Sequence, residues 1–286
     1  VCGGIDLTYD RWDTREHLEH DPRRVNWPGS EHGPWHDITV MMTGPIVGAL
    51  FDLCDTRWQV AGGKPLERPP RPEKKPWPDN LRADFEDVEI GLSRTRAACG
   101  EVTEVREVEE LFLAQIARAR RFIYIENQYF TSRKIAEAIA SRLSEPDPPE
   151  IVIVHPRHAD GWLEQQAMDH ARDLISTAVE ECDAHDSFEV YVPYTGQTPI
   201  YVHAKLMIVD DEVLRIGSSN LNNRSLGLDS ECDTVLDATR PHNANRGIEE
   251  SIHAIRVSLL AEHCGVEEPE MEAALERHGS MQKAIA

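Results

Sequence analysis

The chain has 286 residues, of which 40% are hydrophobic and 28% are charged. This length and mixture indicate a soluble globular protein with one large core or two moderate ones, and they exclude a largely disordered chain. The formal net charge of -21 argues against nucleic-acid partners and against a polybasic membrane anchor, although an acidic surface can still hold a small cationic pocket for one phosphate.

No stretch of the sequence is long and apolar enough to span a bilayer: residues 38–54 come nearest, but they contain Pro45 and Asp52. We therefore expect a cytoplasmic or peripheral membrane location. The cysteines lie far apart without a Cys-x-x-Cys pair, which predicts free, mostly buried thiols in a reducing compartment. They are Cys2, Cys54, Cys99, Cys182, Cys232 and Cys264.

The first segment of the chain has few regular elements. Residues 1–7 and 38–42 are predicted strands, separated by a loop rich in His and Pro, and residues 45–60 are a predicted helix with Pro45 in its first turn. Residues 62–80 read GGKPLERPPRPEKKPWPDN, a basic, Pro-rich stretch that cannot form regular backbone hydrogen bonds. This stretch is the best candidate for a linker between domains.

Strand and helix patterns alternate from residue 88 onward. The predicted strands are 88–92, 122–125, 151–155 and 188–193, and the predicted helices are 103–120, from 132, and 160–182. Residues 202–209 and 213–216, joined at 210–212, predict a hairpin. Helical patterns follow at 243–263 and 267–278. This order predicts an α/β fold with a parallel or mixed sheet flanked by helices.

The hairpin carries the pattern His-x-Lys-x4-Asp at His203, Lys205 and Asp210. The strand period of two places His203 and Lys205 on one face and Asp210 on the other. A histidine beside a lysine suits an anionic substrate, because the ammonium compensates phosphate charge and the imidazole can attack phosphorus or move a proton. Asp210 is better suited to anchoring the strand.

Polar residues after the hairpin add candidate ligands for phosphate. Ser218 and Asn220 are expected on one face of the next strand, with Gly217 allowing close approach of the backbone. Glu231 is a candidate carboxylate for orienting the histidine ring and stabilising its charged form.

The complete string His-x-Lys-x4-Asp-x6-Gly-Ser-x-Asn resembles the signature of the phospholipase D superfamily. Further blocks are similar to that family in the same order: residues 3–7 with 11–14, residues 34–37, and residues 125–130. Residues 3–7 also echo residues 217–221 in the pattern Gly-small-x-Asp/Asn-Leu. The resemblance implies two similar halves around one shared site, with the N-terminal half incomplete.

The resemblance also implies a mechanism without metal or cofactor. One histidine becomes a phosphohistidine, while the other, here His203, protonates the leaving alcohol and then activates water. Aligning Gly3 with Gly217 places the nucleophilic histidine about a dozen residues before Val1, so the chain is expected to be a fragment that is nearly inert alone.

These similarities assign expected domains and site residues. Residues 1–62 would be the remnant of the first half, 63–82 the linker, 83–240 the second half and 241–286 a helical tail. His203, Lys205, Asp210 and Glu231 are expected to be catalytic. Expected substrate-binding residues are Gly4, Asp6, Glu126, Asn127, Gln128, Gly217, Ser218 and Asn220, with Asp13, His36 and Asp37 supporting them.

Several of these assignments have alternatives. Residues 126–128 could instead form the region that caps a helix beginning near Ser132. The histidines at 17, 20, 32 and 36 could form a zinc site, could be ordinary loop residues, or could include His36 and Asp37 at the substrate cleft; their spacing matches no compact zinc signature. The tryptophans at 12, 27, 35, 58 and 77 could be core and loop residues or an aromatic rim for a choline-like ammonium or lipid interface.

Three functions remain open on the sequence. The first is hydrolysis of a glycerophospholipid at a membrane surface, with release or transfer of the head group. The second is phosphatidyl transfer of the cardiolipin-synthase kind, and the third is a non-catalytic half that binds phosphate or lipid. No nucleic-acid partner is expected, and the oligomeric state is left open.

Overall fold

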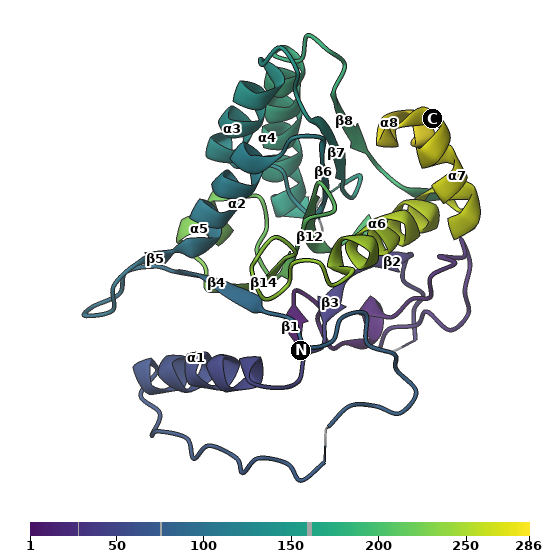
Figure 1. Ribbon diagram of the computed structural model, residues 1–286. Coiled ribbons are helices and arrows are strands. Elements are labelled where there is room, and N and C mark those ends of the chain that lie inside the picture. The colour runs from purple at the N-terminus through teal and green to yellow at the C-terminus, as the bar shows by residue number, and fades with distance from the viewer. Residues whose placement is uncertain (28, 75, 159–161) are drawn as a thin grey trace.

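An eight-stranded mixed sheet forms the centre of the protein (Figure 1). The computed structural model describes residues 1–27, 29–74, 76–158 and 162–286. The strand order is β5-β4-β14-β13-β12-β6-β7-β8; β6, β7 and β8 are parallel, and the other neighbours are antiparallel. The strands are β4 (Ile90–Arg96), β5 (Val105–Arg106), β6 (Phe122–Asn127), β7 (Glu150–Val154), β8 (Phe188–Tyr191), β12 (Lys205–Val209), β13 (Val213–Gly217) and β14 (Glu231–Asp237).

Helices cover both faces of this sheet (Figure 1). In β6, Ile123 and Ile125 face the core under α2 and α3, whereas Phe122 and Tyr124 face the core under the C-terminal helices, as the strand period of two requires. The first layer consists of α2 (Glu107–Arg118), α3 (Arg133–Leu143), α4 (Trp162–Glu180) and α5 (Asn223–Gly227), and the second of α6 (Ile248–Cys264), α7 (Glu268–His278) and α8 (Met281–Ile285). The predicted α/β fold with a mixed sheet flanked by helices is confirmed.

The N-terminal segment has little regular structure. It contains β1 (Cys2–Gly3), a 3-10 turn at Tyr9–Arg11, β2 (Trp35–His36) and β3 (Thr39–Val40). The strand β1 pairs with β3, while β2 runs parallel to β11 (Tyr201–Val202), directly before His203. A separate small hairpin joins β9 (Tyr194–Thr195) to β10 (Thr198–Pro199). The segment is therefore tied to the main sheet beside the hairpin motif.

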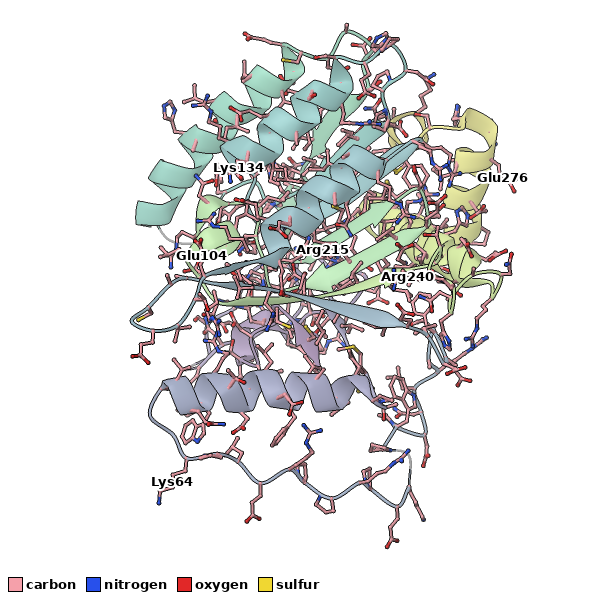
Figure 2. The ribbon with its side chains drawn as sticks, turned by 60° about the vertical axis from the view of Figure 1, so that its left-hand side comes forward. Lys64, Glu104, Lys134, Arg215, Arg240 and Glu276 are labelled. Atoms are coloured by element: carbon pink, nitrogen blue, oxygen red, sulfur yellow. The ribbon has the colours of Figure 1, made fainter. Side chains whose placement is uncertain are left out.

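Helix α1 (Ile46–Val60) lies apart from the sheet (Figure 1), and none of its side chains is buried. Lys64 lies on the loop beyond it (Figure 2), and the described residues from 62 to 80 form no helix or strand. The helix prediction is confirmed, with Pro45 at the N-cap. The domain boundary placed in this loop stays a prediction.

Local sequence signals locate most other elements. Ser132 caps α3 by accepting a hydrogen bond from the Ile135 amide, as the helix predicted from residue 132 requires. The predicted hairpin forms between β12 and β13. The helix predicted from residue 243 begins at Ile248, after Gly247 with its positive φ of 72°. The beginning of the helix predicted at residue 160 lies outside the described residues.

Three sequence predictions were wrong in detail. Only Cys2 and Gly3 of residues 1–7 form a strand, because the chain turns at Asp6 and Thr8. The run 202–209 is interrupted at His203 and Ala204, where the backbone changes partner from β2 to β6. Ser218 and Asn220 follow the end of β13 rather than lying on a strand.

The cysteines are all free, as predicted, but the prediction that most are buried was wrong. Cys2 is buried, Cys232 and Cys264 are half-buried, and the remaining three are exposed. Within the described part of the chain, no helix has the length and apolar character needed to cross a membrane.

Asp210 joins the hairpin turn to the start of β6. Its carboxylate accepts hydrogen bonds from the backbone N–H groups of Arg120, Arg121 and Phe122, at 2.8, 2.8 and 2.9 Å. The residue has a φ of 57°, a conformation that Asp and Asn tolerate better than other non-glycine residues. The side chain thus satisfies three amides that precede or begin a central strand.

Replacing Asp210 with Ala should therefore lower the free energy of unfolding by about 2–4 kcal/mol, because buried amides lose their acceptor. Urea unfolding followed by circular dichroism measures this. Loss of the acceptor and loss of the preference for a positive φ could both contribute. Asp210→Asn separates these two causes, since it keeps the backbone preference but offers only one acceptor oxygen. Asp173→Ala, at an exposed carboxylate, is the control and should change stability little. An Asp210→Ala protein as stable as the parent would contradict the anchoring role.

Candidate active site

His203 is oriented by a carboxylate from the N-terminal segment. Its Nδ1–H donates to Asp37 Oδ2 over 2.8 Å, and its backbone N–H donates to the His36 carbonyl, also over 2.8 Å. The parallel pairing of β2 with β11 produces this contact. Val202 of β11 lies opposite His36 of β2, so the residues that follow them, His203 and Asp37, also lie side by side. Within the described part of the chain, His203 Nε2 makes no hydrogen bond.

Two aromatic rings form a wall beside His203. Trp35 and Tyr201 stack with their ring centroids 4.5 Å apart, and the Trp35 ring lies 5.3 Å from the imidazole. The Arg11 guanidinium also lies over the Trp35 ring, 4.2 Å from the ring centre. The wall fixes the position of the imidazole, and Trp35 is therefore a core residue at the site rather than part of an exposed rim.

Lys205 is buried beside the backbone of His203. Its Nζ donates to Gln128 Oε1 over 3.2 Å and to the His203 carbonyl. Burial lowers the pKa of Lys205 to about 8, and the carboxylates of Asp37, Glu231 and Asp6 limit that shift. Among the residues that the structure describes, no carboxylate pairs directly with Lys205, which favours binding of an added anion.

Gly4 packs directly on Lys205. A Cβ at Gly4 would lie 2.7 Å from Lys205 Cδ, closer than carbon atoms approach without displacement. Asp6, two residues further along, is half-exposed and pairs with Arg11 at 3.5 Å. The structure thus brings the expected Gly4 and Asp6 to the lysine side of the site.

The buried ion pair between Arg215 and Asp233 holds the turn at residues 218–220 in place. The Asp233 carboxylate accepts from the backbone N–H groups of Ser218 and Ser219 and from the guanidinium of Arg215. Arg215 lies inside the protein, against the ring of Phe112 in α2 (Figure 2). Asn220 is aimed at the site, where its Nδ2 lies 3.5 Å from Gln128 Oε1.

Gly217 is needed for this turn because its backbone touches Asp233. A Cβ at this position would lie 1.8 Å from Asp233 Oδ1. The side chain of Asn220 also has a buried Oδ1 without a partner among the described residues. The turn therefore presents a rigid, partly unsatisfied amide beside Lys205.

The expectation that Glu231 orients His203 was wrong. Glu231 begins β14 and accepts a hydrogen bond from Ser218 Oγ, whereas the ring of His203 is bonded to Asp37. The reason is topological, because β11 pairs with the N-terminal segment and not with β14. Burial raises the pKa of Glu231, which remains close enough to Lys205 to affect its charge.

Glu126 does not face substrate, contrary to expectation. It is fully buried, and its carboxylate accepts from His36 Nε2 at 2.6 Å, His263 Nε2 at 3.0 Å and Tyr124 OH at 2.6 Å. Burial would raise the pKa of Glu126, but the two histidines hold it far below its usual value. Burial would lower the pKa of His36, but Glu126 and Glu262 raise it to about 10.

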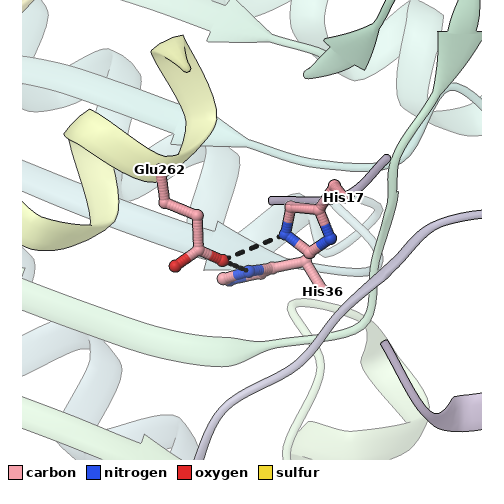
Figure 3. A group of neighbouring side chains, drawn as sticks. All are labelled: His17, His36 and Glu262. Atoms are coloured by element: carbon pink, nitrogen blue, oxygen red, sulfur yellow. Dashed lines mark hydrogen bonds and ion pairs between the residues drawn. The ribbon is translucent and has the colours of Figure 1, made fainter. Parts of the chain in front are cut away.

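The network continues to the N-terminal loop through Glu262 of α6. Its Oε1 is 2.7 Å from His36 Nδ1 and 3.1 Å from His17 Nε2 (Figure 3). His17 Nδ1 in turn donates to Asp13 at 2.8 Å, and Asp13 also pairs with the buried Arg24. Asp13 and His36 therefore support the segment that carries Asp37, because their polar atoms bond to buried side chains.

These histidines could in principle hold a metal ion. His17, His36 and Glu262 place ligand atoms within 4.8 Å of one another, as do His36, Glu126 and His263. Imidazole nitrogen and carboxylate oxygen are common zinc ligands. The same atoms hydrogen-bond to one another in this structure, so a metal would have to replace those bonds and the proton on His36. The expectation of a metal-free reaction stays a prediction.

The other expected residues have mainly structural contacts. Asn127 Oδ1 accepts from the backbone N–H groups of Tyr129 and Leu221, which fastens the end of β6 to the turn after β13. Gln128 reaches the site, bonding Lys205 through its oxygen and Tyr201 through its nitrogen. Of residues 126–128, only Gln128 therefore contacts the proposed catalytic side chains.

Sequence reasoning missed Glu262 and His263, which lie in the predicted helical tail. The available signal was their position beside Leu259 and Leu260 on the buried stripe of α6, where a charged side chain requires a partner. Arg215 was missed for a similar reason, since it interrupts an apolar strand. Neither signal identifies the partner.

Comparisons with known proteins agree with the motif. A sequence model of the family described as "Phospholipase D" matches residues 162–283. Phospholipase D alpha 1 of Nicotiana tabacum is 26% identical over 369 residues, covering 92% of this chain and 46% of that protein. The Arabidopsis thaliana protein of the same name is 26% identical, with the same coverage. The chain thus spans about half the length of these relatives.

Solved structures of two proteins also resemble the chain. Nuc of Salmonella typhimurium, titled a phospholipase D family member, has a TM-score of 0.40 at 17% identity and covers 60% of this chain and 93% of its own. Phosphatidylserine synthase of Haemophilus influenzae has a TM-score of 0.44 at 14% identity, and the match covers 69% of this chain and 48% of the synthase chain.

The pKa of Lys205 makes stability depend on pH. Because the folded pKa is below the unfolded value of 10.5, the unfolded chain binds more protons between about pH 8 and 10.5, and stability contributed by this group rises with pH there. The stability difference between the parent and Lys205→Met should shift in favour of the parent by about 2 kcal/mol from pH 7 to 9.5. Urea unfolding at both pH values measures it; a constant difference would contradict the lowered pKa.

The buried network predicts a large effect of Glu126→Gln. The amide leaves charged His36 without its carboxylate, which should cost about 3–5 kcal/mol of unfolding free energy. Glu104→Gln is the matched control, because its pair with Arg106 is 45% exposed on the Glu side and its loss should change stability little. Equal losses in the two variants would show that the network does not hold the N-terminal segment.

Proposed function

Because this chain is a member of the phospholipase D superfamily, a family of phospholipase D-like enzymes, we propose that it supplies the acid/base half of a glycerophospholipid phosphodiesterase. The reaction releases the head-group alcohol by hydrolysis or transfers the phosphatidyl group to another alcohol. The observation that carries the proposal is the pairing of His203 Nδ1 with Asp37, which leaves Nε2 without a hydrogen bond among the described residues, while buried Lys205 bonds the His203 carbonyl.

The geometry suits proton transfer by His203. With Nδ1–H bonded to Asp37, Nε2 can give a proton to the oxygen of the leaving alcohol as the phosphorus–oxygen bond breaks. The Asp37 carboxylate stabilises the imidazolium that forms when Nε2 later takes a proton from water or an acceptor alcohol. The oxygen so activated then attacks phosphorus, the phosphorus–nitrogen bond of the phosphohistidine breaks to release the second histidine, and His203 is again protonated on Nε2.

Lys205 and Asn220 suit the non-bridging oxygens of the phosphate. Lys205 has a pKa of about 8 in the free protein, and an approaching phosphodiester favours its charged form. Asn220 lies on the rigid turn held by Asp233 and can donate through Nδ2. Together they would place the phosphorus next to His203 without a long rearrangement of the backbone.

The covalent intermediate requires a second histidine that attacks phosphorus. In a site formed by two similar halves, each half would lend a carboxylate to the histidine of the other. Asp37 of the N-terminal segment already serves His203, so Glu231 is the corresponding candidate to orient the second histidine. Its burial and its hydrogen bond from Ser218 fit a carboxylate held in a fixed position.

The proposal predicts loss of activity when either member of the pair is changed. The protein with its upstream gene sequence is incubated with phosphatidylcholine vesicles and ethanol, and phosphatidate and phosphatidylethanol are quantified. His203→Asn should lower the rate by about 1000-fold or more, and Asp37→Asn by about 100-fold. His242→Asn changes a half-exposed histidine and is the matched control, expected to act like the parent.

Two outcomes would overturn the proposal. One is turnover by His203→Asn at the rate of the parent. The other is binding of vesicles by the parent without formation of either product, which would favour a half that binds lipid but does not catalyse.

A further inference from the structure

Two cysteines that are far apart in the sequence meet beside the site. Cys2 in β1 and Cys232 in β14 are separated by 230 positions, yet their Sγ atoms are 4.0 Å apart. Cys2 Sγ also lies 3.4 Å from the Cys232 carbonyl oxygen. Cys2 is 8% exposed and Cys232 is half-buried, so the pair is shielded but not fully enclosed.

The surrounding backbone is suited to a bond between them. Cys2 pairs with Val40 of β3, and Cys232 pairs with Arg94 in the main sheet, so both residues are held in strands. A disulfide has a sulfur–sulfur distance of about 2.05 Å, so each sulfur must move by roughly 1 Å. Rotation of the two side chains can supply much of that movement.

We propose that Cys2 and Cys232 form a redox-sensitive modification site, a reversible disulfide that fixes the N-terminal segment to the main sheet. The oxidant is a peroxide. The Cys2 thiolate attacks a peroxide oxygen, so the oxygen–oxygen bond breaks, Cys2 becomes a sulfenic acid and water leaves. The Cys232 sulfur then attacks the Cys2 sulfur, releasing the oxygen as a second water. Two thiols lose two protons and two electrons, and one hydrogen peroxide becomes two waters.

The directions of the two pKa shifts favour a different role for each thiol. Contact with Cys232 lowers the pKa of the Cys2 thiol, although burial opposes the shift. The same contact, together with burial, raises the pKa of Cys232 well above its ordinary value. Since the thiolate is the reactive form, Cys2 is the group that attacks the oxidant and Cys232 the group that resolves the product.

The disulfide would connect parts of the proposed site. Cys2 precedes Gly4, which packs on Lys205, and Cys232 follows Glu231, which accepts from Ser218. Oxidation therefore restrains the contact between the N-terminal segment and the strand that carries these groups. Reduction removes this restraint and leaves the segment held by its other contacts, such as that of Gly4 with Lys205.

The test uses the 286-residue chain with Cys54, Cys99 and Cys182 changed to Ser, which removes the exposed thiols. A small excess of hydrogen peroxide should reduce the mass by two hydrogens, and non-reducing peptide mapping should link Cys2 to Cys232. The oxidised protein should melt about 5 °C or more above the reduced one, because the bond closes a very long loop. Dithiothreitol should reverse both changes.

Cys232→Ser is the matched variant, since it keeps the size of the side chain and should abolish both the link and the rise in melting temperature. Cys264→Ser, at a half-buried cysteine elsewhere, should abolish neither. The proposal is overturned if Cys2 and Cys232 both still react with iodoacetamide in the unfolded, peroxide-treated chain, or if the linked protein melts no higher than the reduced one.

Discussion

The ion pair between His36 and Glu126 is the interaction on which the site depends. Both side chains are buried, so each charge would be costly alone, and each holds the other in its charged form. Glu126 belongs to a central strand, whereas His36 belongs to a segment with only two-residue strands. The pair therefore fastens an irregular segment to a rigid sheet. Asp37, next in the chain, is thereby placed at His203.

The local electrostatics of the site differ from those of the whole chain. The net charge of -21 would repel a phosphodiester in general, yet Lys205 lies in a buried position where, among the described residues, its hydrogen-bond acceptors are one amide oxygen and one carbonyl. Burial lowers the pKa of Lys205, and the anion that we propose as its ligand would raise that pKa again. The acidic side chains nearest to it are engaged elsewhere: Asp37 with His203, and Glu231 with Ser218.

Local patterns in the sequence predicted most of the fold, because strand alternation, the Ser132 cap and the hairpin at Asp210 depend on neighbouring residues. The motif likewise identified His203 and Lys205. The partner of His203 could not be predicted, because the parallel pairing of β2 with β11 joins residues more than 160 positions apart. The same limit explains why Glu231 was chosen over Asp37, and why Glu126 was assigned to substrate when it binds His36. Contacts between distant buried polar groups leave no local periodicity.

The claim that Asp37 orients His203 is tested most directly by finding which nitrogen of the neutral His203 ring carries the proton. Long-range nitrogen–proton NMR of the chain labelled with 15N-histidine gives this position, and His203→Asn assigns the signal. The account predicts a proton on Nδ1, bonded to Asp37, and a bare Nε2, with the Nε2–H form appearing in Asp37→Asn. A proton on Nε2 in the parent, unchanged by Asp37→Asn, would contradict the claim that the N-terminal segment orients the catalytic histidine.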